Sequence, residues 1–251
     1  MLFVWCKVSF DEKRSHGSAV CETVYFFVEF VCVFPWKCVS LNNQNRGKIM
    51  DGILRKLPIG IQTFEKLREG DYLYVDKTAL VWRIASTETP YFLSRPRRFG
   101  KSLLLSTFEA YFEGKKELFE GLAIADMEKE WKTYPVFHLD LNAEKYDSPQ
   151  ALVEILSRQL TQWELKYGKG EDEETLSGRF AGVIRRASEQ ADRGVVVLVD
   201  EYDKPLLQAL DDGALLDDYR KTLKAFYGVL KSSDRYLRFV FLTGVTKFAQ
   251  V

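Results

Sequence analysis

The sequence of 251 residues lacks several features that would place it in a common class of protein. It has only two histidines, His16 and His138, so we do not expect a metal site built on histidine side chains. Its four cysteines all lie within the first 38 residues, and their spacing fits neither a zinc site nor a disulfide framework. The formal net charge is zero, which gives no support to a general role in nucleic-acid binding.

A membrane-spanning segment and a secretion signal are also missing. The most apolar stretch, residues 20–39, is interrupted by Glu22 and Glu29 and closed by Pro35 and Lys37. No clean apolar run approaches the roughly 18–20 residues that a span requires. The N-terminal charges are mixed, and no small-residue cleavage site follows a compact apolar core. We therefore expect a cytoplasmic protein without a membrane partner.

Residues 1–49 differ in composition from the rest of the chain. They are rich in Phe, Val, Cys and Trp without a clear period, whereas the sequence after Met50 has an ordinary globular pattern. We interpret residues 1–49 as an atypical extension that is disordered or not native, with translation starting at Met50, and residues 50–251 as the globular domain. A family-specific N-terminal arm is the alternative. The intact mass of the natively expressed protein distinguishes the two.

After Met50, short apolar segments alternate with amphipathic ones. Strands are predicted at residues 91–94, 136–141, 195–199 and 237–242. Helices are predicted at residues 61–68, 80–85, 101–112, 149–167, 176–192 and 215–231. Nearly unbroken apolar strands that alternate with helices indicate an α/β fold, in which helices cover both faces of a mainly parallel sheet.

A basic loop with one glycine follows the first strand. The sequence Arg95-Pro-Arg-Arg-Phe-Gly-Lys-Ser102 matches the phosphate-binding pattern G-x-x-x-x-G-K-[ST], except that Arg95 stands where the first glycine is usual. In such a loop, backbone amides and a helix N-terminus bind phosphate oxygens. Lys101 would neutralise the outer phosphates, and Ser102 would ligate Mg²⁺. The predicted ligand-binding residues are Arg97, Arg98, Phe99, Gly100, Lys101, Ser102 and Leu103.

Two residues of this loop depart from the usual pattern. Arg95 replaces the glycine of the tight turn, and Pro96 removes one backbone donor. The loop arginines can compensate, because a guanidinium group matches phosphate oxygens in geometry. The alternative is a solvated basic loop that contacts no ligand.

An acidic pair, Asp200-Glu201, directly follows the apolar strand 195–199. An aspartate at this place would hold Mg²⁺, and the adjacent glutamate would activate the attacking water as a general base. The alternative is a strand that simply ends in solvent. Thr243, at the end of the last strand, is a candidate for positioning the water, or else part of a plain turn at Gly244. We expect His138 to be structural rather than a ligand.

Residues from about Leu57 to the end resemble the AAA-ATPase-like domain found in many bacterial proteins. The segments that carry the resemblance are Pro58-Ile-Gly-Ile, Tyr74-Val-Asp-Lys-Thr78, the stretch from Arg95 to Ser106, Val199-Asp-Glu-Tyr-Asp-Lys-Pro205 and Phe241-Leu-Thr-Gly-Val-Thr-Lys-Phe248. Arginine in place of the first loop glycine is the pattern of that family. The resemblance implies a P-loop (AAA-like) three-layer sandwich that binds ATP and Mg²⁺.

The resemblance also implies more chain than is present here. Members commonly carry a C-terminal domain similar to PD-(D/E)XK nucleases, and AAA-type domains have a further core strand and a helical lid. We therefore expect a domain that is truncated before the last core strand and lid, with ATP and a protein partner or a second copy as partners. The predicted function is ATP binding, with hydrolysis in the full-length family. A nucleotide-gated switch and an interaction module with little or no hydrolysis are the alternatives. Tyr72, Tyr74 and Asp76 are candidates for the adenine site.

Overall fold

The computed structural model describes residues 55–87, 89–142 and 145–246, all within a unit that spans Lys48–Val251. The predictions for residues 1–49 and for a start at Met50 lie outside the described residues. Within these residues, helices α2 (Phe64–Glu69) and α3 (Thr78–Ala85) precede the first strand. The strands are β1 (Tyr91–Ser94), β2 (Val136–Asp140), β3 (Val195–Asp200) and β4 (Leu237–Gly244). The later helices are α4 (Lys101–Phe112), η1 (Lys116–Phe119), α5 (Ala123–Met127), α6 (Pro149–Tyr167), α7 (Leu176–Ala191), α8 (Lys204–Gln208), α9 (Gly213–Ser232) and η2 (Asp234–Tyr236).

The four strands form one parallel sheet in the order β1-β4-β3-β2. β3 lies inside this sheet, and all six of its residues are buried. That environment explains its sequence, because a central strand covered on both faces needs apolar side chains throughout. The parallel arrangement brings the C-terminal ends of β1, β3 and β4 to the same edge, and Asp200 is the last residue of β3.

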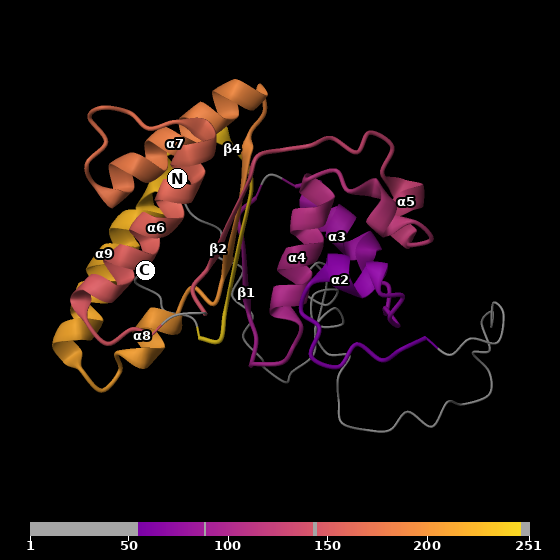
Figure 1. The fold of residues 1–251 in the computed structure, drawn as a ribbon, viewed down its shortest axis with the longest axis horizontal. Coiled ribbons are helices and arrows are strands. Elements are labelled where there is room, and N and C mark those ends of the chain that lie inside the picture. The colour runs from indigo at the N-terminus through magenta and orange to yellow at the C-terminus, as the bar shows by residue number, and fades with distance from the viewer. Residues whose placement is uncertain (1–54, 88, 143–144, 247–251) are drawn as a thin grey trace, which may run out of the picture. The chain divides into compact units, whose positions relative to one another are not determined.

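Helices cover both faces of the sheet, as predicted (Figure 1). Helices α6, α7 and α9 lie on one face and pack against one another. Helix α4 lies directly on the other face, and α2 and α3 pack behind it. The fold is therefore an α/β sandwich of three layers with an all-parallel sheet.

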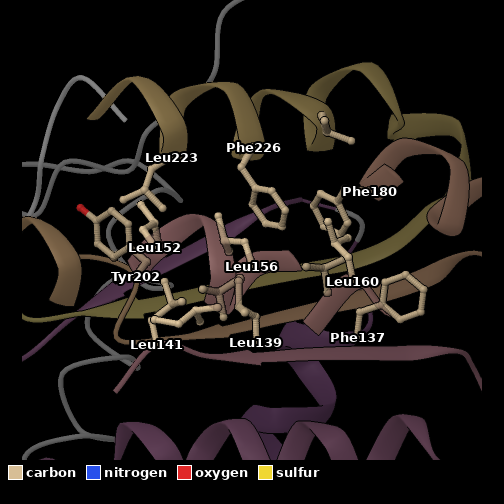
Figure 2. Close-up of a cluster of buried hydrophobic side chains, with 14 of the residues drawn as sticks. Phe137, Leu139, Leu141, Leu152, Leu156, Leu160, Phe180, Tyr202, Leu223 and Phe226 are labelled. Atoms are coloured by element: carbon tan, nitrogen blue, oxygen red, sulfur yellow. The ribbon is translucent and has the colours of Figure 1, made fainter. Parts of the chain in front are cut away.

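Large apolar side chains join α6, α7 and α9 to the sheet (Figure 2). The ring of Phe137 in β2 stacks on Trp163 of α6, with centroids 4.5 Å apart. The ring of Phe180 in α7 stacks on Phe226 of α9 at 4.4 Å. Such pairs add about 0.5–1.5 kcal/mol beyond the burial of their area. This layer packs against β2 and β3.

The predicted elements agree closely with the observed ones where the segment is long. The helices at residues 101–112 and 149–167 and the strand at residues 91–94 have the predicted bounds. Helix α2 begins at Phe64 rather than at residue 61, and β4 continues two residues further, to Gly244, because Thr243 and Gly244 pair with β1. Helices α5 and α8 were not predicted, because five residues are too few to show a helical period.

Candidate functional site

The loop between β1 and α4 presents two arginines to solvent. Arg97 and Arg98 are exposed, and within the described part of the chain neither has a hydrogen-bond or ion-pair partner. Gly100, just before α4, has a φ of 76°, a left-handed conformation that favours glycine. Arg98 has a φ of 68°, which costs about 1–2 kcal/mol in a residue with a side chain. Strained residues of this kind concentrate at ligand sites, so the loop has the features of a binding loop.

Lys101 is the buried centre of the loop. Its side chain is only 3% exposed, and its ammonium group Nζ donates to the backbone carbonyls of Arg95 at 3.1 Å and Pro96 at 3.3 Å. The same Nζ lies 3.0 Å from Oε1 of Glu201. This ion pair connects the loop to the acidic end of β3 across a hundred residues of sequence, so the two motifs form a single site.

The acidic end of β3 is tied to the end of β4 through one hydroxyl group. Oγ1 of Thr243 donates to Oδ1 of Asp200 at 2.5 Å and accepts from the backbone N–H of Glu201 at 3.3 Å. Thr243 is fully buried and Asp200 is 4% exposed. Glu201 has a φ of 53°, so a strained residue lies on the acidic side of the site as well. Thr243 therefore lies in β4 and contacts both members of the acidic pair, and its role in positioning water stays a prediction.

Arg95 behaves differently from the other loop arginines. Its backbone N–H donates to the carbonyl of Gly244 at 3.0 Å, which extends the pairing of β1 with β4 by one residue. Its Nη1 donates to the carbonyl of Ser94 at 3.3 Å, and its Nε is buried without a partner among the described residues. The residue that replaces the first loop glycine thus belongs to the edge of the sheet.

The side chains at this edge include oxygen donors of the kind that Mg²⁺ takes. Ser102 is half-buried in the first turn of α4, and within the described part of the chain its side chain contacts no other polar group. Among the described residues no three His, Cys, Asp or Glu side chains gather as metal ligands. Mg²⁺ suits such a site, because it usually takes one or two protein oxygens and completes its shell with water and phosphates. A hydroxyl and a carboxylate are oxygen donors of that kind.

Of the candidates for the adenine site, one has a structural role. Both carboxylate oxygens of Asp76 are used. Oδ1 accepts from the backbone N–H and the hydroxyl of Thr78, and Oδ2 accepts from the N–H of Ala123. Asp76 therefore ties the start of α3 to the start of α5. Burial raises the pKa of the Tyr74 hydroxyl, and the ring of Tyr74 packs edge-on against Phe64.

His138 lies on the α4 side of β2, where its Nδ1 is 3.0 Å from Oε2 of Glu109. Burial alone would lower the pKa of this imidazole, but the hydrogen bond and the charge of Glu109, with smaller contributions from Asp200 and Asp140, raise it above 6.5. This contact is consistent with the structural role that we predict for His138.

Two residues of the site were not among the predicted ones. Tyr202 and Asp203 follow Glu201, and both make hydrogen bonds to the segment that follows β4. Their place in the sequence, next to the acidic pair, was the available signal. The contacts themselves depend on β4 lying beside β3, which the sequence does not show.

Comparison with known proteins finds a matching family and a similar protein. Residues 58–251 match the family AAA-ATPase_like, described as "Predicted AAA-ATPase". The chain is 42% identical over 198 residues to "Uncharacterized protein in vnfD 5'region" of Azotobacter chroococcum mcd 1. This alignment covers 78% of the chain but only 38% of that protein. No solved structure matches the chain significantly. None of the helices in the described residues is both long and apolar enough to span a bilayer. Because the family match covers most of the sequence, the chain belongs to the predicted AAA-ATPase-like family.

Proposed function

We propose that residues 50–251 form an ATP-binding domain of a P-loop ATPase, which binds ATP with Mg²⁺, with hydrolysis in the full-length members of the family. The observation that carries this proposal is the ion pair between Lys101 and Glu201. It joins a basic loop at a helix N-terminus to a carboxylate pair at the end of the buried strand β3, which β4 separates from β1. The chain spans 38% of its curated relative, so the activity of a longer protein is part of the proposal. A cytoplasmic location is also part of the proposal.

The loop would bind the phosphates. Backbone amides from Arg97 to Leu103 and the N-terminus of α4 would receive the phosphate oxygens, with the exposed arginines adding charge from the side. On phosphate binding, the ammonium group of Lys101 would leave Glu201 and pair with the outer phosphates instead. A lysine suits this exchange, because it is a point charge on a flexible stem.

Ser102 and Asp200 would hold the magnesium ion. When bound, Mg²⁺ supplies positive charge that stabilises the negative charge developing on the transferred phosphoryl group. The protein's contribution is the position of these two oxygens. Thr243 fixes one of them, because its hydroxyl donates to Oδ1 of Asp200 and leaves Oδ2 free.

Glu201 would accept a proton from the attacking water, and Thr243 would help to position that water. The carboxylate can do so only after it has released Lys101, since one ion pair occupies both groups. Phosphate binding would therefore free the general base. The same pair supports the alternative of a nucleotide-gated switch, in which this exchange is the output and turnover is slow.

Two variants and a control test the proposal. Calorimetry with ATP and Mg²⁺ should show binding to the wild-type chain and a large loss for Lys101→Ala. Glu201→Gln should bind more tightly than wild type, because the anion that competes for Lys101 is gone, while turnover falls by about 10²–10⁴-fold. Lys115→Ala removes a lysine that also pairs with carboxylates, but away from the loop, and should change neither quantity.

The outcomes separate the alternatives. Equal and slow turnover in wild type and Glu201→Gln, with binding retained, would identify a switch. If the wild-type chain does not bind ATP with Mg²⁺, the proposed function is wrong and an interaction module is the better description.

A further inference from the structure

The segment Thr243–Thr246, at the end of β4, lies between the two halves of the proposed site. Two of its four carbonyls accept hydrogen bonds from the β1 side. Those of Gly244 and Val245 accept from the N–H of Arg95 at 3.0 Å and the hydroxyl of Ser94 at 2.9 Å. The other two accept from Tyr202, which follows the acidic pair: Thr243 from its N–H at 2.8 Å and Thr246 from its hydroxyl at 3.1 Å. We call this segment the bridge segment.

One carboxylate holds the bridge segment in place. Oδ2 of Asp203 accepts from the backbone N–H groups of Val245 at 2.9 Å and Thr246 at 2.6 Å, and from the Thr246 hydroxyl at 2.7 Å. Asp203 is fully buried. Its other oxygen, Oδ1, has no partner among the described residues.

Gly244 makes the approach of Asp203 possible. A Cβ atom at this position would lie 2.7 Å from Oδ1 of Asp203 and 2.6 Å from the ring of Tyr202. Real Cβ atoms do not come so close to other atoms, so any larger residue would push these two side chains away from the bridge segment. The requirement is one of space, because Gly244 lies in a regular strand.

We propose that Asp203 is a positioning residue of the site, which sets the phosphate loop and the Asp200-Glu201 pair at their working distance through the bridge segment. This rests on the proposed function. Lys101 can exchange between Glu201 and a phosphate only if the loop and the end of β3 keep a defined separation. The polar contacts described above run from Ser94 and Arg95, through the bridge segment, to Tyr202 and Asp203.

The use of a charged group supports this role. A fully buried carboxylate is costly unless its charge is compensated by strong hydrogen bonds. Three donors on one oxygen provide that compensation, since hydrogen bonds to an ionised acceptor are about twice as strong as neutral ones. An ordinary turn after a strand does not need such an acceptor.

Hydrogen exchange tests the coupling without any nucleotide. In Asp203→Ala, the amides of Val245 and Thr246 lose their acceptor. They should exchange faster whether or not Asp203 is a positioning residue. The proposal adds that the amide of Arg95 also exchanges faster, by roughly tenfold or more, because the bridge segment holds its acceptor. Faster exchange confined to residues 245 and 246 would overturn the proposal. Asp212→Ala is the matched control, since Asp212 also accepts from two backbone N–H groups, but at the start of α9.

Steady-state kinetics with ATP and Mg²⁺ tests the consequence for the site. A misplacement of about 1 Å lowers a rate by up to roughly 100-fold, so kcat of the folded Asp203→Ala protein should fall by about 10–100-fold. KM should change much less, because the loop remains intact. Asp203→Asn keeps one acceptor oxygen and should recover most of kcat. Unchanged kcat in the folded Asp203→Ala protein would show a structural role only.

Gly244→Ala disturbs the same contact from the other side, and it keeps the test valid if Asp203→Ala does not fold. It should lower kcat and speed exchange at Arg95 in the same way, whereas Gly228→Ala, at an open position in α9, should do neither. If the wild-type chain does not bind ATP, the proposed function is refuted. The coupling through Asp203 is tested separately, because the hydrogen-exchange experiment uses no nucleotide.

Discussion

Two ion pairs of this protein are almost equally buried, yet they have different surroundings. Lys101 and Glu201 at the sheet edge have side chains that are 3% and 12% exposed. Arg179 and Glu164, which join α7 to α6, are 10% and 6% exposed. Burial alone therefore does not separate a pair that is part of a site from a pair that supports the fold.

Their hydrogen bonds do separate them. The guanidinium of Arg179 donates to both oxygens of Glu164, at 2.8 and 2.7 Å, and its other donors bind Ser157 and Thr161. This planar fork is matched to its carboxylate and cannot be transferred without losing several bonds at once. Lys101 makes a single contact with Glu201, so a phosphate can replace that partner at little cost.

The largest effect on stability should come from the helical pair. Arg179→Ala leaves Glu164 as a buried charge without its partner, and removal of one member of such a pair costs about 3–5 kcal/mol. Urea unfolding measures this loss of unfolding free energy. Arg185→Ala is the control, because its pair with Glu189 is about half exposed and should contribute roughly 1 kcal/mol at most. Similar losses for both variants would contradict the comparison.

The next largest effects on stability should come from glycine substitutions, and they should differ between α7 and the loop before α4. A Cβ at Gly182 in α7 would lie on Oε1 of Glu173, so Gly182→Ala must displace the carboxylate that binds Arg186. We expect a loss of about 1–3 kcal/mol, as for other overpacked positions. A Cβ atom at Gly100 would have no other atom within 4 Å. Only the left-handed φ of this residue opposes Gly100→Ala, at a cost of about 1–2 kcal/mol. Thermal unfolding of both variants, with Gly228→Ala as a reference, checks the difference.

The site pair should contribute less to stability than the helical pair. In Lys101→Ala, Glu201 can turn toward water, because its side chain is already 12% exposed at the edge of the sheet. We expect a loss of about 1–2 kcal/mol in unfolding free energy, close to that of a hydrogen bond to a charged group. A loss as large as that of Arg179→Ala would mean that Lys101 supports the fold rather than a ligand.

The smallest effect should be a pH dependence from His138. Its pKa is raised above 6.5 in the folded state, because Glu109 more than offsets the effect of burial. The protonated imidazole therefore contributes stability that is fully present below pH 6.5 and lost as the pH rises through the folded pKa. The stability difference between wild type and Glu109→Gln should be larger below pH 6.5 than well above it. Glu65→Gln should show no such change, since its partner Lys115 does not titrate there.

Sequence patterns were sufficient for the long elements and for the separate motifs. The period of residues 101–112 and 149–167 defines α4 and α6, because a helix of three or more turns shows its buried face directly. The short helices α5 and α8 have no such period. The phosphate-loop pattern and the acidic pair were visible as local sequence, and the roles assigned to their residues stay predictions.

By itself, the sequence determined the α/β class, the family and the residue types of the candidate site, because these depend on local periodicity and on short motifs. Only the tertiary structure decided which groups meet. Lys101 reaches Glu201, and Asp203 reaches Thr246, because β4 lies between β1 and β3 and the parallel strands end at one edge. Strand order depends on packing between segments that are distant in the chain, and no local pattern encodes it.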